Sequence, residues 1–152
     1  MIGNIKKKLY LLALSIFIIV LDQFTKNIIF NNYNKYINKD FYLFKIDFVK
    51  NYGAAFNIFS GNRIFLSITS VVFSIILIYL ILRKNNTKFI NYLSYSFILA
   101  GAVGNGIDRL VNGYVIDFIN LNIINFPVFN IADISINIGF ILILYSFFKN
   151  KK

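Results

Sequence analysis

Residues 64–82 read IFLSITSVVFSIILIYLIL and contain no charged side chain. A run of about 20 apolar residues matches the thickness of the hydrocarbon core of a bilayer, so this stretch predicts a transmembrane helix. Three further runs of this kind lie at residues 9–30, 89–107 and 128–148. We therefore expect an α-helical integral membrane protein with four transmembrane helices.

The composition of the chain agrees with this fold class. Of the 152 residues, 58% are hydrophobic and only 14% are charged, which is typical of a membrane protein. The four spans leave two outer loops, residues 31–63 and 108–127, together with short tails. These segments are too short for a second domain of ordinary size, so we expect one membrane domain covering residues 1–152.

The distribution of basic residues predicts the orientation. The chain has a formal charge of +10, and its basic residues cluster at the ends of the spans, where they meet lipid headgroups rather than nucleic acid. With a cytoplasmic N-terminus, the inner segments carry lysine and arginine and no acid, and every aspartate lies outside. Residues 6–21 resemble the basic and apolar regions of a signal peptide, but no small-x-small cleavage site follows. We therefore interpret residues 9–30 as a retained first helix with both termini cytoplasmic.

The outer loops contain signs of other structure. Apolar and polar residues alternate from Tyr42 to Phe48, and residues 114–119 have strand composition, so a short extracytoplasmic β-sheet is expected. Asn112-Gly113 predicts a tight two-residue turn. Residues 54–59 predict a short interfacial helix with Phe56 and Phe59 toward lipid.

The residue types that are missing restrict the chemistry. The sequence has no cysteine, histidine or glutamate, which excludes thiol nucleophiles, serine-histidine relays and nearly every zinc site. Acid-base chemistry is therefore left to the six aspartates.

Several polar residues lie in or beside the spans, where an unpaired ionisable group is costly. Asp22 and Lys26 are four residues apart on one helix face, which fits an interfacial ion pair. Asn105, Asp108 and Arg109 share a face at the end of the third span, which fits a helix end satisfied by its own side chains. Ala100 and Gly104 have the spacing of a helix-packing motif.

Asp117 and Asp133 differ from these residues because each lies among apolar neighbours with no base at helical spacing. Two such carboxyl groups brought together can share one proton, so that one activates a water while the other protonates a carbonyl oxygen. A structural role is the alternative, for example Asp133 as the N-cap of the last helix, after Pro127.

Five blocks of the sequence, in this order, resemble the lipoprotein signal peptidases, the type II signal peptidases of bacteria. They are Leu21-Asp22-Gln23-Phe24-Thr25-Lys26, Asn51-Tyr52-Gly53-Ala54-Ala55-Phe56, Gly101-Ala102-Val103-Gly104-Asn105-Gly106-Ile107-Asp108-Arg109, Val115-Ile116-Asp117-Phe118-Ile119 and Phe126-Pro127-Val128-Phe129-Asn130-Ile131-Ala132-Asp133. One departure is Ala100 where the family usually has a first glycine of Gly-Gly-Ala, which adds a methyl group at a packing position.

The resemblance implies an aspartyl endopeptidase of the bacterial inner membrane, with its active site at the extracytoplasmic face. It would cleave diacylglyceryl-modified prolipoproteins before the lipidated cysteine. The catalytic pair implied by the motifs is Asp117 and Asp133. The substrate-binding and supporting positions implied are Asp22, Lys26, Asn51, Gly53, Asn105, Asp108, Arg109 and Asn130.

No metal or other cofactor is implied, because two aspartates and a water suffice. The expected partners are lipidated prolipoproteins and membrane lipids, not nucleic acid, and the protein is expected to be a monomer. An ion- or proton-coupled transporter is the alternative function, but no aspartate lies near the middle of a span, where such proteins bind their ions. A non-catalytic assembly factor would leave the apolar surroundings of the two aspartates without a purpose.

Overall fold

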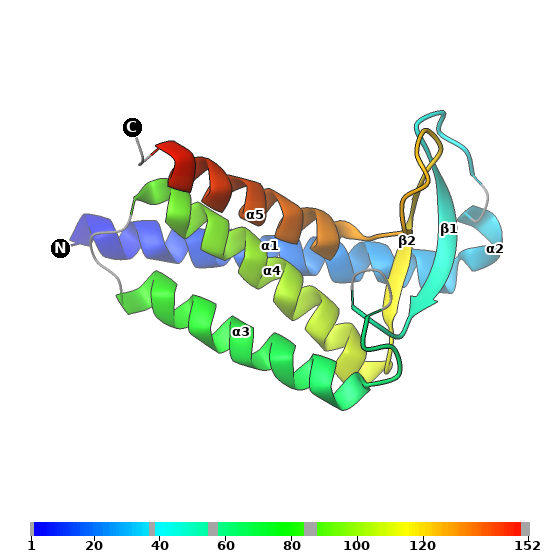
Figure 1. Cartoon of the computed structure of the whole chain (residues 1–152), viewed down its shortest axis with the longest axis horizontal. Helices are drawn as coiled ribbons and strands as arrows, with labels where there is room; N and C mark the ends of the chain where they lie inside the picture. The colour runs from blue at the N-terminus through cyan, green and yellow to red at the C-terminus, as the bar shows by residue number, and fades with distance from the viewer. Residues whose placement is uncertain (1, 37–38, 55–57, 84–87, 150–152) are drawn as a thin grey trace.

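The computed structural model describes residues 2–36, 39–54, 58–83 and 88–149. Four long helices lie side by side, and a small sheet crosses one end of them (Figure 1). The elements in chain order are α1 (Ile2–Asn31), α2 (Tyr33–Tyr36), β1 (Phe44–Asn51), α3 (Arg63–Arg83), α4 (Phe89–Val111), β2 (Val115–Leu121) and α5 (Ile131–Lys149). The N- and C-terminal ends of the chain lie at the opposite end of the bundle from the sheet.

Helix α4 is the centre of the bundle, because it contacts α1, α3 and α5. Its buried side includes small or polar residues such as Ser94, Ser96, Gly101 and Gly104. These residues let neighbouring helices approach closely, but they make α4 less apolar than a lipid-exposed helix.

Three helices in the described part of the chain are long and apolar enough to cross a membrane. They comprise Ile5–Asn31, Arg63–Leu82 and Ile131–Lys149. Three of the four expected spans are therefore matched by apolar helices. Helix α4 has the expected length but is less apolar, because its polar residues face the inside of the bundle.

The C-terminal end of α4 differs from the sequence prediction in two ways. The helix continues to Val111 instead of ending at 107, because Asp108 and Arg109 are buried helical residues. Asn112-Gly113 does not form a hairpin turn but ends this helix, with the N–H groups of both residues donating to the carbonyl of Asp108. Gly113 has a φ of +85°, a left-handed conformation that glycine adopts without strain after a helix.

Helix α5 begins at Ile131 and not at residue 128 as expected. The reason is that Phe129 still has extended conformation and pairs with Ile119, each accepting a hydrogen bond from the other's N–H group. Pro127 therefore belongs to the connection before the helix and is not its first residue.

The expected sheet is present as two antiparallel strands, β1 and β2, one from each of the loops 31–63 and 108–127. The pairing runs from Phe44 opposite Leu121 to Asn51 opposite Val115, with a register shift between Ile46 and Val49.

The expected interfacial helix at residues 54–59 is only partly within the described chain. Phe56 and its two neighbours, residues 55–57, lie outside the described residues, and residues 58–61 form a turn instead of a helix. The short helix that the structure does contain, α2, directly follows α1.

Close packing of α5 on α4 gives a test of the bundle. A methyl group at Gly139 would lie 2.5 Å from Cγ1 of Ile98 and 2.8 Å from the carbonyl oxygen of Ser94. We expect Gly139→Ala to lower the free energy of unfolding by about 1–3 kcal/mol, because the added methyl forces the helices apart. Thermal unfolding of the purified protein in detergent measures this change.

The matched control is Ile141→Ala on the same helix, since Ile141 is 64% exposed on the bundle surface. Equal melting temperatures for Gly139→Ala and the wild type would show that α4 and α5 have room for a methyl group at this position.

Candidate active site

Asp117 lies in the middle of β2 and is 1% exposed. Its neighbours Ile116 and Phe118 pack against Ile29 of α1, which fixes the strand on the bundle. The two oxygens of the Asp117 carboxylate accept hydrogen bonds from Nδ2 of Asn51 at 2.9 Å and from Nδ2 of Asn130 at 2.6 Å.

Asp133 lies in the first turn of α5. Its carboxylate accepts hydrogen bonds from Nδ2 of Asn105 at 2.8 Å and from the backbone N–H of Asn130 at 3.1 Å. In return, the backbone N–H of Asp133 donates to Oδ1 of Asn130 at 2.9 Å. This reciprocal pair is a capping box in which Asn130 is the N-cap, so the alternative that Asp133 is itself the N-cap is wrong.

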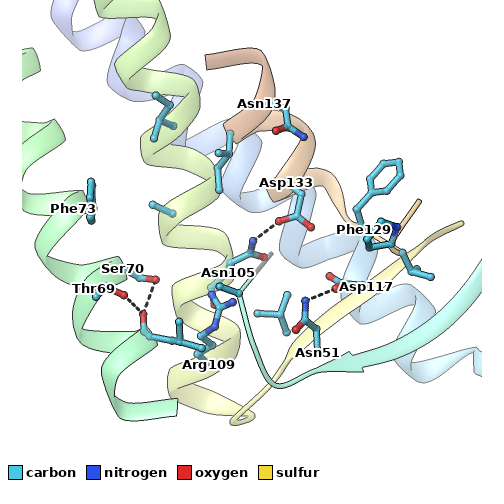
Figure 2. A pocket seen from close by; sticks show the side chains of 18 of the residues that line it. Asn51, Thr69, Ser70, Phe73, Asn105, Arg109, Asp117, Phe129, Asp133 and Asn137 are labelled. Atoms are coloured by element: carbon cyan, nitrogen blue, oxygen red, sulfur yellow. Dashed lines mark hydrogen bonds between the residues drawn. The ribbon is translucent and has the colours of Figure 1, made fainter. Parts of the chain in front are cut away.

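Asn130 joins the two aspartates, because its side chain contacts Asp117 while its backbone contacts Asp133. Figure 2 shows both carboxylates directed into the same cavity, Asp117 from the strand and Asp133 from the helix. The structure thus brings together two carboxyl groups that are 16 residues apart in the sequence.

The surroundings of Asp117 change its affinity for protons. Burial in the protein, with a smaller contribution from the neighbouring Asp133, raises the pKa of the Asp117 carboxyl to about 7. Hydrogen bonds donated by Asn51 and Asn130 oppose this rise, because they stabilise the ionised form. Asp117 therefore exchanges its proton near neutral pH, as an acid-base catalyst requires.

Lys26 connects the residues that surround the two aspartates. Its ammonium group is 2.8 Å from the carboxylate of Asp22 and 2.9 Å from that of Asp108, and it donates a hydrogen bond to Oδ1 of Asn105 at 3.0 Å. Lys26 is 2% exposed and Asp22 is fully buried. The predicted ion pair between Asp22 and Lys26 is therefore present, but it is buried inside the bundle, where Lys26 also links α1 to Asp108 of α4.

Asp108 also makes contacts beyond its own helix. Besides Lys26, it accepts hydrogen bonds from the side chain of Gln23 at 3.1 Å and from the backbone N–H of Ile116 at 3.3 Å. The end of α4 is thus satisfied by α1 and β2 and not only by its own side chains. Gln23 was not predicted as a site residue, although it stands between Leu21 and Lys26 as a polar residue within an apolar run.

The packing motif at Ala100 and Gly104 is confirmed by the structure. Ala100 is fully buried. A side chain at Gly104 would meet the carboxylate of Asp22 at 2.8 Å and the methyl group of Ala132 at 3.2 Å. Glycine at this position lets α1 and α5 approach α4 beside the site.

Arg109 connects the outer loop to this network. Its Nη2 donates to the carbonyl of Gly53 at 2.7 Å, and Nη1 approaches the carbonyl of Asn105 at 3.5 Å. The backbone N–H of Gly53 in turn donates to Oδ1 of Asn51. The Nε group of Arg109 is buried and has no hydrogen-bond partner among the described residues.

Arg63 is a second supporting residue that was not predicted from the sequence. At the start of α3, its guanidinium donates to the carbonyls of Arg109 at 2.7 Å and Leu110 at 2.5 Å. It therefore supplies donors to the last turn of α4, where helix carbonyls lack partners within the helix. Only the tertiary contact reveals this role, because Arg63 stands alone between a loop and a span in the sequence.

Every site residue nominated from the sequence belongs to one connected network of hydrogen bonds and ion pairs. The members are Asp22, Lys26, Asn51, Gly53, Asn105, Asp108, Arg109, Asp117, Asn130 and Asp133. The network borders a cavity of about 470 Å³ that extends from the outer loops to the space between α3, α4 and α5.

Comparison with known proteins agrees with this arrangement. Residues 14–149 match the family described as signal peptidase (SPase) II. The chain is 44% identical to the lipoprotein signal peptidase of Gloeothece citriformis, with 93% of this chain and 91% of the relative covered. It is 43% identical to that of Wigglesworthia glossinidia brevipalpis, with 93% and 94% covered.

The fold is shared with a bacterial membrane enzyme whose structure was determined by the in meso method at 2.3 Å resolution. The TM-score is 0.83 at 34% sequence identity, and the alignment covers 94% of this chain and 90% of the other. By sequence and by fold, the chain belongs to the signal peptidase II family, the lipoprotein signal peptidases.

Proposed function

We propose that this chain is the aspartic endopeptidase that removes signal peptides from diacylglyceryl-modified prolipoproteins, cleaving before the lipidated cysteine. Family membership supports the substrate class. The observation that carries the chemistry is the joint hydrogen bonding of Asp117 and Asp133 to Asn130 at the edge of one cavity.

The reaction needs one ionised and one protonated carboxyl group. The ionised carboxylate takes a proton from a water, whose oxygen attacks the peptide carbonyl carbon, and the other carboxyl gives its proton to the carbonyl oxygen. The carboxyl group that took the proton of water gives it to the amine nitrogen of the cysteine as the C–N bond of the tetrahedral intermediate breaks, and a hydroxyl group of the intermediate returns a proton to the other carboxylate. Each aspartate then returns to its starting state, as general acid-base catalysis requires.

We assign the proton of the resting pair to Asp117 and the role of base to Asp133. The pKa of about 7 means that Asp117 holds a proton on much of the enzyme at neutral pH. Asp133 lies in the first turn of α5, where the positive end of the helix dipole and the N–H of Asn130 stabilise its negative charge.

Arg109 is suited to hold the substrate. Its guanidinium is oriented by the carbonyl of Gly53 and borders the cavity. A guanidinium keeps its charge during turnover, so this residue binds a substrate carbonyl without exchanging protons with the aspartates.

We place the site at the outer face of the bacterial inner membrane, with α1, α3, α4 and α5 as four spans and both termini cytoplasmic. The charge distribution supports this orientation. A site at this level meets water while the lipid anchor of a substrate stays in hydrocarbon. The protein is proposed to act as a monomer in contact with membrane lipids, because all residues of the network come from one chain. Membership in a peptidase family favours hydrolysis over the transporter and assembly-factor alternatives.

Replacing either carboxylate tests the proposed chemistry. Asp117→Asn and Asp133→Asn should each lower the rate of prolipoprotein cleavage by roughly 10²- to 10⁴-fold, because an amide neither accepts the proton of water nor donates one to the carbonyl. Cleavage of a synthetic diacylglyceryl prolipopeptide by the purified variants measures this loss. The control is Asp47→Asn on β1, away from the network, which should cleave normally. Near-normal activity of either active-site variant would contradict the assignment of Asp117 and Asp133 as the catalytic pair.

The pH dependence tests the role of Asp117. The rate of the wild type should fall as the pH rises through about 7, where Asp117 loses its proton. The hydrogen bond from Asn51 stabilises the ionised form and so lowers the pKa of Asp117. Asn51→Ala should therefore move this alkaline limb to higher pH, whatever its effect on the maximal rate. A limb that stays in place or moves to lower pH would contradict this interpretation.

Cysteine labelling tests the orientation, because the chain has no natural cysteine. Single cysteines at Tyr42 and Ile123, which are 88% and 72% exposed, should react with a membrane-impermeant reagent added outside the cytoplasmic membrane. A cysteine in place of Lys6 should react with this reagent only after the membrane is permeabilised. The reverse pattern would show that the termini are outside.

A further inference from the structure

The cavity continues past the two aspartates into the bundle. Its deeper part is lined by apolar side chains of three helices, among them Phe73 of α3, Ile98 and Ala102 of α4 and Ile136 of α5. Asn137 of α5 is a polar exception in this lining, and Figure 2 shows it one turn along α5 from Asp133. Residues four apart lie on the same helix face, so Asn137 and Asp133 border the same cavity.

The side chain of Asn137 differs in its contacts from two polar side chains near it, those of Ser135 and Asn130. Ser135 donates to the carbonyl of Phe97, and Asn130 uses its amide within the active-site network. The Asn137 carboxamide is exposed and forms no hydrogen bond to another described residue. An amide has two N–H donors and two acceptor lone pairs. In an apolar environment within a transmembrane bundle, leaving these groups without partners costs free energy.

The substrate supplies groups that match this amide, if the chain cleaves signal peptides as proposed above. The peptide must be extended at the cleaved bond to fit between the carboxylates. The apolar part of a signal peptide is helical in hydrocarbon, because its backbone groups have no other partners there. Where the helix ends, up to four backbone groups lack partners.

We propose that Asn137 binds the backbone of the signal peptide where it passes from helical to extended conformation. The α5 backbone rises about 6 Å between Asp133 and Asn137, and an extended chain covers this distance in about two residues. The contact therefore falls about two residues on the N-terminal side of the cleaved bond. Asn137 is a substrate-binding residue that takes no part in proton transfer.

Replacing the amide by an apolar side chain of similar size tests this role. Asn137→Leu should raise KM for a diacylglyceryl prolipopeptide up to about tenfold, the equivalent of one hydrogen bond, and should leave kcat and its pH profile nearly unchanged. Asn137→Gln, which keeps the amide, should recover part of the affinity. Ile138→Ala is the matched control, because Ile138 is the next residue of α5, is 37% exposed and is not among the residues that line the cavity, and it should leave KM unchanged.

A second measurement locates the contact on the substrate. A series of peptides is prepared in which one backbone amide at a time, on the N-terminal side of the cleaved bond, is replaced by an ester that removes the N–H donor and weakens the carbonyl acceptor. With the wild type, KM should rise most for the replacement about two residues before that bond. With Asn137→Leu the same replacement should cost little more, since the partner is already gone.

The outcomes separate this inference from the proposed function. If the wild type cleaves the lipidated peptides but Asn137→Leu has an unchanged KM, or if the ester penalties are the same in both proteins at every position, the assignment of Asn137 is overturned while the proposed function stands. If the wild type leaves every lipidated peptide intact, the proposed function fails, and the inference with it.

Discussion

The positive charge of Lys26, buried between two carboxylates, is the constraint on which the sheet end of the bundle depends. The ammonium group contacts Asp22 on its own helix and Asp108 on α4. Removing one partner of a buried ion pair leaves an uncompensated charge and typically costs about 3–5 kcal/mol. The pairing therefore fixes the rotation and depth of α1 against α4, and with them the position of Asn105.

Asparagines carry this fixed geometry from the ion pairs to the aspartates. Lys26 donates to the oxygen of the Asn105 amide, so the nitrogen of that amide is turned toward Asp133. Nδ2 of Asn130 donates both to this oxygen of Asn105 and to the carboxylate of Asp117. Amides suit this position because each supplies a donor and an acceptor without taking up or losing a proton. We therefore expect Asp117 and Asp133 to be the groups of this network that gain and lose protons during the reaction.

The two carboxylates come from different kinds of element, and the site exists only where these elements meet. Asp133 is fixed by the capping box at the start of α5, whereas Asp117 arrives on a strand of the outer sheet. The sheet is held on the bundle by the packing of Ile116 and Phe118 on Ile29, and by the pairing of Ile119 with Phe129. Support of this kind from rigid elements keeps reacting groups within the narrow tolerances that catalysis requires.

The sequence by itself predicted the long helices, the two strands of the sheet and the aspartates proposed to react. Apolar runs of bilayer length and alternating residues are local signals, and the lack of histidine, cysteine and glutamate left only aspartate for acid-base chemistry. Only the tertiary structure decided that Asp22 and Lys26 are buried instead of interfacial, that α5 starts at Ile131, and that Gln23 and Arg63 support the site. The physical reason is that these features depend on partners distant in sequence, and neither spacing nor local preference specifies which distant group satisfies a buried charge or a helix end.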